Sequence, residues 1–181
     1  MPNPRGRAGG TLRATMLIVA ISGSLRAKSS NTALLHAAAR VAPPGMEIVF
    51  YEGMGALPHF NPDLDLEGSV PPPAVAELRS LLNDAGGVLI SSPEYAYGVP
   101  GSLKNLLDWL VSCGELVGKP VLLINAASGG GATAQASLVQ TLKAMHWNVL
   151  ESASLRGNTV DGAIEKQLRT SLDALAVAIG K

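Results

Sequence analysis

Small hydroxyl and amide side chains, together with one arginine, gather in residues 23–32, between an apolar run and a helical pattern. The candidates are Ser24, Arg26, Ser29, Asn31 and Thr32. Backbone N–H groups at such a strand-to-helix turn point towards an anion, and the helix dipole favours negative charge there. The G-x-x-x-x-G-K-[ST] and G-x-G-x-x-G motifs are missing from this segment. We therefore predict a metal-free site for the phosphate of a mononucleotide such as FMN, with helix capping by Ser29 or Asn31 as the alternative.

A second loop, residues 92–101, combines prolines and glycines with Glu94, Tyr95 and Tyr97. Aromatic residues make up only 4% of the chain, yet two tyrosines stand here directly after a predicted strand. We interpret them as a platform for a flat ring, with Glu94 as a hydrogen-bond acceptor. A rigid loop with a tyrosine packed over the sheet edge is the alternative.

A third loop contains Ser128 followed by Gly129, Gly130 and Gly131. Consecutive glycines are costly to order, so they favour a place where the backbone approaches something closely. Exposed N–H groups there would match the polar edge of a planar ring. A flexible connector is the alternative.

Strand-like and helix-like patterns alternate along the chain. The predicted strands are 16–21, 47–51, 87–92, 120–125 and 147–150, and the predicted helices are 31–41, 73–84, 101–112, 132–145 and 161–179, the last with Asp161 as N-cap. Continuous apolar strands indicate a parallel sheet with both faces covered. We predict an α/β, flavodoxin-like three-layer sandwich with a five-stranded parallel sheet in the order 2-1-3-4-5. Ligands bind such sheets at the carboxyl ends of the strands, which places the three loops on one rim.

Composition limits the possible functions. The chain has 181 residues, of which 47% are hydrophobic, and its formal net charge is zero. Neutrality argues against nucleic-acid binding and charge-driven membrane binding. The single cysteine excludes an intrachain disulfide, and the cytoplasm is the expected location. We expect residues 1–15 to be a disordered extension and residues 16–181 to form one domain; the long loop 52–72 is expected to be functional or to cover something.

From about residue 16 to about residue 155, the chain resembles the NAD(P)H-dependent FMN reductase family, which includes quinone, azo-dye and chromate reductases. The matching residues are Gly23 to Arg26 with Ser29 and Asn31, Pro93 to Tyr95, Pro100-Gly101, Lys104-Asn105, Asp108-Trp109 and Ser128 to Gly130. The resemblance implies that bound FMN carries the chemistry without a catalytic side chain. It implies NADPH, favoured over NADH, as reductant, and a quinone, free flavin, azo compound or metal oxyanion as acceptor. It also implies a homodimer or homotetramer and no metal.

The resemblance further implies roles for individual residues. Ser24, Arg26, Ser29, Asn31 and Thr32 would hold the FMN phosphate. Pro93, Glu94, Tyr95 and Tyr97 would border the ribityl chain and the isoalloxazine, and Ser128, Gly129, Gly130 and Gly131 would meet the polar edge of the ring. Lys104, Asn105, Asp108 and Trp109 would fix the tyrosine loop onto the helix 101–112.

Two other functions are weighed against this one. A flavodoxin-type one-electron carrier usually docks through a strongly acidic surface, and the equal numbers of acidic and basic residues, 14 each, argue against it. A nucleotide-binding regulatory module would need the first loop but neither of the others.

Several remaining residues are predicted to be structural. We expect Cys113 to be a buried small hydrophobic residue, His36 and His146 to be structural or on the surface, and His59 to be solvated. Asp63, Asp65 and Glu67 are predicted to form a solvated loop and not a metal site.

Overall fold

The apolar runs form a parallel sheet in the computed structural model, which describes residues 15–127, 131–156 and 162–180. The strands are β1 (Met16–Ser22), β2 (Met46–Tyr51), β3 (Gly87–Ser91), β4 (Pro120–Asn125), β5 (Asn148–Val149) and β6 (Leu155–Arg156). They run in the order β2-β1-β3-β4-β5, with β6 also paired to β4. The predicted flavodoxin-like fold and strand order 2-1-3-4-5 are confirmed.

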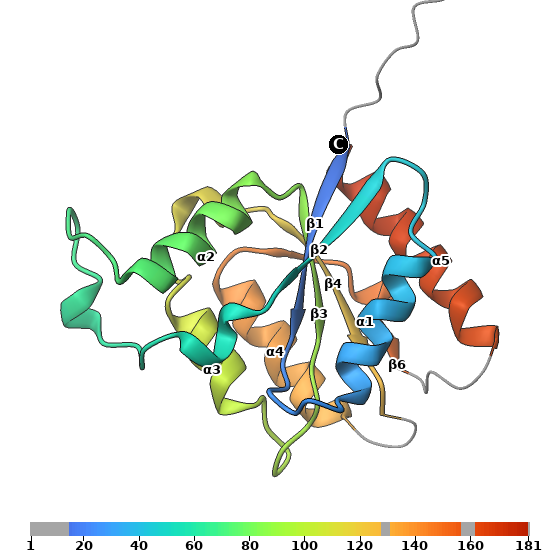
Figure 1. Cartoon of the computed structure of the whole chain (residues 1–181), viewed down its shortest axis with the longest axis horizontal. Helices are drawn as coiled ribbons and strands as arrows, with labels where there is room; N and C mark the ends of the chain where they lie inside the picture. The colour runs from blue at the N-terminus through green and yellow to red at the C-terminus, as the bar shows by residue number, and fades with distance from the viewer. Residues whose placement is uncertain (1–14, 128–130, 157–161, 181) are drawn as a thin grey trace, which may run out of the picture.

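Helices cover both faces of this sheet. They are α1 (Ser30–Arg40), α2 (Pro73–Asp84), α3 (Gly101–Asp108), α4 (Ala132–Ala144) and α5 (Gly162–Ile179), with short 3-10 turns η1 (Gly53–Ala56), η2 (Pro62–Leu64), η3 (Gly114–Leu116) and η4 (Glu151–Ala153). Helices α1 and α5 lie on one side of the sheet, and α2, α3 and α4 lie on the other (Figure 1). This is the predicted three-layer arrangement.

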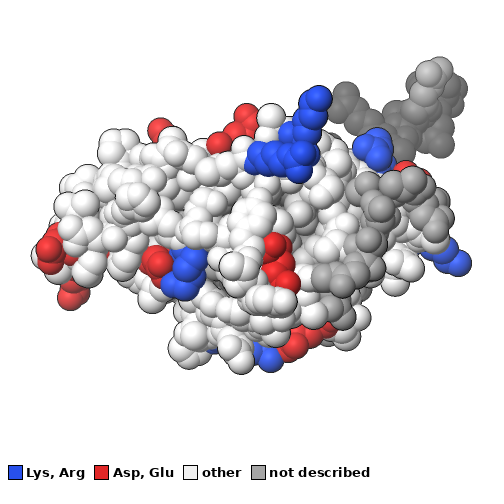
Figure 2. Space-filling model, turned by 90° about the horizontal axis from the view of Figure 1, so that it is seen from below, with Lys and Arg blue, Asp and Glu red and all other residues white. Residues whose placement is uncertain are grey.

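The strands β1 and β3 point downward in Figure 1, so Figure 2 looks onto the face at their carboxyl ends. Most of the visible surface on that face is uncharged, with a few blue and red side chains, some of which adjoin (Figure 2). The rim that is expected to bind a ligand is therefore largely neutral.

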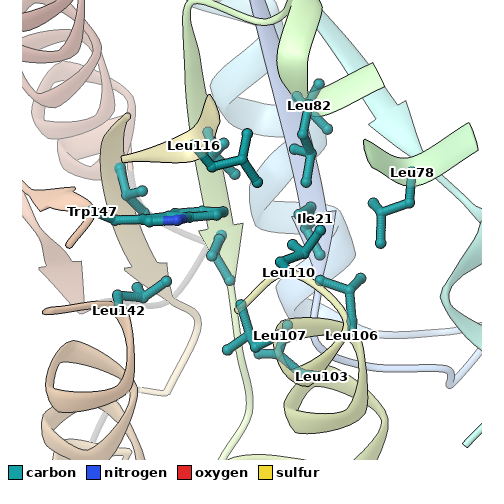
Figure 3. Packing of buried hydrophobic residues seen from close by; sticks show 14 of the residues in the cluster. Ile21, Leu78, Leu82, Leu103, Leu106, Leu107, Leu110, Leu116, Leu142 and Trp147 are labelled. Carbon is teal, nitrogen blue, oxygen red and sulfur yellow. The ribbon is translucent and has the colours of Figure 1, made fainter. Parts of the chain in front are cut away.

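Side chains of each central strand alternate between two buried clusters. In β1, Val19 and Ile21 join the cluster beneath α2, α3 and α4, while Ile18 and Ala20 join the one beneath α1 and α5. Figure 3 shows part of the first cluster, where leucines of α2 and α3 surround Ile21 and Leu142 of α4 lies beside Trp147. Burial on both faces explains why these strands read as continuous apolar runs.

Apart from element ends that shift by one or two residues and short 3-10 turns, the structure differs from the predicted elements in two places. Helix α3 ends at Asp108, where 101–112 was predicted, because the Leu110 and Val111 N–H groups bond three residues back, to Leu107 and Asp108 at 2.9 and 3.4 Å. A continuing α-helix would bond four residues back instead. The Arg79 guanidinium donates to the Trp109 carbonyl in this turn, from Nε at 3.1 Å and from Nη2 at 2.5 Å. Strand β6 was not predicted, since two residues give no periodic signal.

Some predictions concern residues that the structure does not describe. Residues 1–14 of the expected extension and the expected N-cap Asp161 lie outside the described ranges. Within those ranges, no helix is both long and apolar enough to cross a membrane.

Tyr51, the last residue of β2, places a hydroxyl group in the core, and its contribution to stability can be tested. The Tyr51 hydroxyl is buried and has no hydrogen-bond partner in the described part of the chain; burial, and secondarily Glu77, raise the pKa of this phenol. Because an unpaired buried hydroxyl costs free energy, we expect Tyr51→Phe to match the wild type or to be up to about 1 kcal/mol more stable in urea denaturation. The exposed Tyr97→Phe is the control, with no change expected. A clear loss of stability in Tyr51→Phe would contradict the unpaired hydroxyl.

Candidate functional site

Three strands end in polar residues at the same edge of the sheet. Ser22 of β1 lies opposite Ser91 of β3, and β4 ends at Asn125 beside them. The loops that follow these residues are the three that the sequence singled out. The structure therefore brings them together at the strand order reversal, where α/β sheets bind ligands.

The first loop is organised by its own hydroxyl groups. Ser29 is the N-cap of α1, and its Oγ accepts a hydrogen bond from the Thr32 N–H at 3.3 Å. The Ser24 Oγ accepts one from the Arg26 N–H at 3.3 Å, and the hydroxyls of Ser22 and Thr32 are 2.8 Å apart. The capping alternative for Ser29 is thus confirmed.

Capping leaves several backbone donors for a ligand. Among the described residues, the N–H groups of residues 27–31 donate no hydrogen bond. They lead into the start of α1, where the dipole favours an anion, and Arg26 stands exposed next to them. Residues 22–32 include no carboxylate. This donor set fits a phosphate monoester, so the residues present are compatible with FMN.

A cavity of about 380 Å³ lies on the β2 side of this loop. It is lined by Ser24, Arg26 and Thr32 from the loop and α1. His36 and Phe50, whose rings stack at 4.3 Å, also line it. The first loop is therefore accessible from this side as well as from the rim.

Asn31 has a role that the sequence did not predict. Its buried Oδ1 accepts hydrogen bonds from the Ser91 hydroxyl at 2.9 Å and from the Ala126 N–H at 3.2 Å. One side chain thus joins the start of α1 to the ends of β3 and β4. The Nδ2 group is the part of this amide that could donate to a phosphate.

The second loop forms a tight hairpin. Tyr95 and Gly98 exchange two backbone hydrogen bonds, of 3.1 and 2.9 Å, around Ala96 and Tyr97. Both central residues have positive φ, +48° and +62°, as a type I′ turn requires. Tyr95 and Tyr97 are 55% and 78% exposed. The hairpin therefore presents two tyrosines on the rim, and their role as a platform for a flat ring stays a prediction.

The hairpin stores strain that a single substitution should release. Alanine is unfavourable at φ +48°, whereas glycine adopts this conformation freely. We expect Ala96→Gly to stabilise the protein by up to about 1 kcal/mol, measured by urea denaturation without flavin. Ala33→Gly, on the exposed face of α1, is the control and should destabilise by about 1 kcal/mol. A loss of stability in Ala96→Gly would argue against the left-handed turn.

The third loop is described only at its ends, because Ser128, Gly129 and Gly130 lie outside the described residues. Gly131 has φ +84°, and a Cβ atom there would lie 2.3 Å from the Asn125 Nδ2 atom. The Asn125 Oδ1 atom accepts from the Ala127 N–H at 2.8 Å. The predicted close approach exists at Gly131, but the neighbour is a side chain of this protein.

The predicted supports on α3 hold a different loop from the one expected. Asn105 Nδ2 and Trp109 Nε1 both donate to the Pro58 carbonyl, at 3.0 and 2.8 Å, and the Phe60 N–H donates to Asn105 Oδ1 at 2.8 Å. The Phe60 ring meets the Trp109 ring edge-on at 5.1 Å. The prediction that these residues fix the tyrosine loop is wrong, since they anchor the loop 52–72.

The charged residues near these anchors form ion pairs within the protein. Lys104 and Asp108 form an ion pair along the surface of α3. Asp65 pairs with Arg79 at 2.8 Å, which ties the loop 52–72 to α2. No signal in the sequence could have found the Asp65 pair, because it joins two separate elements.

Cys113 and the exposed histidines give no sign of a catalytic or metal site within the described residues. Burial raises the pKa of the half-buried Cys113 thiol, which keeps it protonated at neutral pH. His59 and His146 are exposed. Within the described ranges, no three side chains of the metal-ligating kind lie together.

Comparison with known proteins gives a consistent result. The family model described as NADPH-dependent FMN reductase matches residues 16–160. A quinone reductase of Escherichia coli K12 is 32% identical over 160 residues, covering 86% of this chain and 85% of that protein. An NAD(P)H-dependent FMN reductase of Pseudomonas aeruginosa is 36% identical over 156 residues, covering 84% and 83%.

Solved structures agree with the observed fold. A flavoenzyme NAD(P)H:(acceptor) oxidoreductase from Paracoccus denitrificans superposes with a TM-score of 0.75 at 28% identity, covering 91% of this chain and 97% of that one. An archaeal flavodoxin superposes with a TM-score of 0.63 over 90% of this chain and 99% of that one. Its identity of 13% indicates a shared fold alone.

Proposed function

The chain belongs to the NADPH-dependent FMN reductase family, and we propose that it transfers electrons from NAD(P)H to a quinone at the rim formed by its three loops. As a member of this family it is an oxidoreductase that uses FMN and a nicotinamide reductant. When bound, FMN would supply the redox chemistry between the nicotinamide and the acceptor. The protein residues bind, orient and shield the reacting groups.

The observation that carries the proposal is the run of N–H groups at residues 27–31 that donate no hydrogen bond within the described part of the chain. With the hydroxyls of Ser24, Ser29 and Thr32, the Asn31 amide and the Arg26 guanidinium, these donors would bind the FMN phosphate. Charge-assisted hydrogen bonds from Arg to phosphate are among the stronger ones in proteins. The phosphate would thereby be anchored at the start of α1.

The other two loops would hold the flat part of the flavin. Pro93, Glu94, Tyr95 and Tyr97 would border the ribityl chain and the ring. Ser128, Gly129, Gly130 and Gly131 would face its polar edge. The tyrosine hairpin supports this placement because it exposes aromatic area on the same rim as the phosphate donors.

The acceptor is proposed to be a quinone because the rim is largely uncharged and carries exposed aromatic rings (Figure 2). A neutral flat molecule matches such a surface better than an anion does. Curated relatives that are 32% to 37% identical are named as quinone reductases and oxidoreductases. Free flavin, azo compounds and metal oxyanions are the other candidates, and NADPH is proposed to be preferred over NADH.

The oligomeric state, location and partners of the enzyme are also part of the proposal. We propose a homodimer or homotetramer in the cytoplasm, acting without nucleic acid, membrane or metal. The single cysteine agrees with a reducing compartment. The domain is proposed to span residues 16–181.

An anaerobic spectrum tests the function directly. The purified protein is loaded with FMN, and NADPH and NADH are added in separate samples before a quinone. We expect the flavin bands to bleach with NADPH faster than with NADH and to return on addition of the quinone. Flavin that resists both nucleotides would support a one-electron carrier, and absent flavin binding would contradict the placement of all three loops.

A further inference from the structure

The first turn of α4 is capped by a residue from another loop. The Ala134 N–H donates to the Glu94 Oε2 atom at 2.8 Å, across 40 positions of sequence. Helices usually receive this bond from their own N-cap side chain, but the N-cap of α4 is Gly131, which has none. A serine or aspartate cannot replace it, since φ is +84° and a Cβ atom would collide with Asn125. The capping acceptor therefore comes from the loop after β3.

This bond connects two loops of the rim. Glu94 directly precedes the tyrosine hairpin, and α4 begins directly after Gly131. The Glu94 carboxylate thus fixes the hairpin relative to the start of α4. Asn31 makes the corresponding connection on the opposite side, between β3 and the residue that follows β4.

We propose that Glu94 is a positioning residue of the flavin site, and that its charge also makes the bound flavin harder to reduce. The inference rests on the proposed placement of the ring between these two loops. The positive end of the α4 dipole points at the same rim, and a carboxylate there offsets its partial charge. Without that carboxylate, the helix end would favour the electron-rich reduced flavin. Glu94 would accordingly act through α4 and the loops, and not by transferring a proton.

Two substitutions separate the bond from the charge. Glu94→Gln keeps an oxygen acceptor and removes the charge, whereas Glu94→Ala removes both. Glu47→Ala, at an exposed position of β2, is the control. Three quantities are measured: hydrogen exchange of the Ala134 N–H without FMN, the FMN dissociation constant, and the flavin midpoint potential.

In Glu94→Ala we expect Ala134 to exchange about 10-fold faster and the FMN dissociation constant to rise about 10-fold, as loss of a charge-assisted hydrogen bond predicts. In Glu94→Gln both values should stay within about 3-fold of wild type, while the midpoint potential becomes more positive. Glu47→Ala should change none of the three.

Each part of the proposal can be overturned separately. Unchanged exchange of Ala134 in Glu94→Ala would show that the cap does not form in solution. Faster exchange with unchanged FMN affinity would reduce the cap to a structural contact and overturn the positioning role. An unchanged potential in Glu94→Gln would overturn the role of the charge. If FMN protects neither residues 27–31 nor the hairpin from exchange in the wild type, the proposed flavin placement fails. That failure can be told apart from a failure of the Glu94 cap, because the Ala134 exchange is measured without flavin.

Discussion

Gly131→Ala should destabilise the flavin-free protein by about 3 kcal/mol in urea denaturation, and it should weaken FMN binding. An alanine at φ +84° costs about 1–2 kcal/mol in the left-handed region. Its Cβ would also lie 2.3 Å from the Asn125 Nδ2 atom, so the buried Asn125 would have to move. That movement breaks the bond from Ala127 N–H to Asn125 Oδ1, which contributes about another 1 kcal/mol.

Gly118→Ala is the matched control for this prediction. Gly118 has a similar φ of +78°, but a Cβ atom there would meet nothing within 4 Å. Its loss should therefore be limited to the backbone cost of about 1–2 kcal/mol, with FMN affinity unchanged. Equal losses of stability in the two variants would contradict a steric role for Asn125.

The elements that rest on local patterns could be predicted from the sequence. Strands β1, β3 and β4 are apolar because both sheet faces are covered, and their length and composition identify them without any tertiary information. Their parallel order then places the three loops together, since all carboxyl ends meet at one edge. The fold and the position of the rim can thus be predicted from sequence patterns that each extend over about ten residues.

The side-chain links between loops could not be predicted in the same way. Asn31 is a residue type typical of a helix cap, yet its amide oxygen accepts hydrogen bonds from Ser91 and Ala126, which are 60 and 95 positions away. The cap that Glu94 provides for α4 spans 40 positions. Such pairings leave no periodic signal, because each partner looks like an ordinary polar residue in its own segment.

The errors around α3 have the same physical origin. Its apolar spacing continues to residue 112, but the N–H groups of Leu110 and Val111 bond three residues back, and Arg79 from α2 binds the Trp109 carbonyl in that turn. Asn105 and Trp109 were expected to hold the tyrosine loop, which follows β3, and instead they bind Pro58 in the loop after β2. A pattern on one helix shows which residues can serve as anchors, while tertiary packing decides which loop they hold.

Arg26→Ala should raise the FMN dissociation constant about 10- to 100-fold while leaving the free energy of unfolding unchanged. Hydrogen bonds to charged groups contribute about 1.5–3 kcal/mol, which corresponds to this range. The Arg26 side chain is exposed, so its removal leaves no buried gap. Fluorescence titration of the flavin-free protein with FMN measures the affinity, and urea denaturation measures the stability.

Riboflavin and a second cation of the same loop provide the controls. Riboflavin has no phosphate, so its affinity should be the same for Arg26→Ala and for the wild type. Lys28 is also exposed in this loop but lacks the planar fork of arginine, and Lys28→Ala should change FMN affinity by less than about 3-fold. Equal losses of FMN and riboflavin affinity in Arg26→Ala would mean that Arg26 contacts the ring or the ribityl chain. Unchanged FMN affinity would exclude Arg26 from the phosphate site and leave the N–H groups of residues 27–31 as its principal donors.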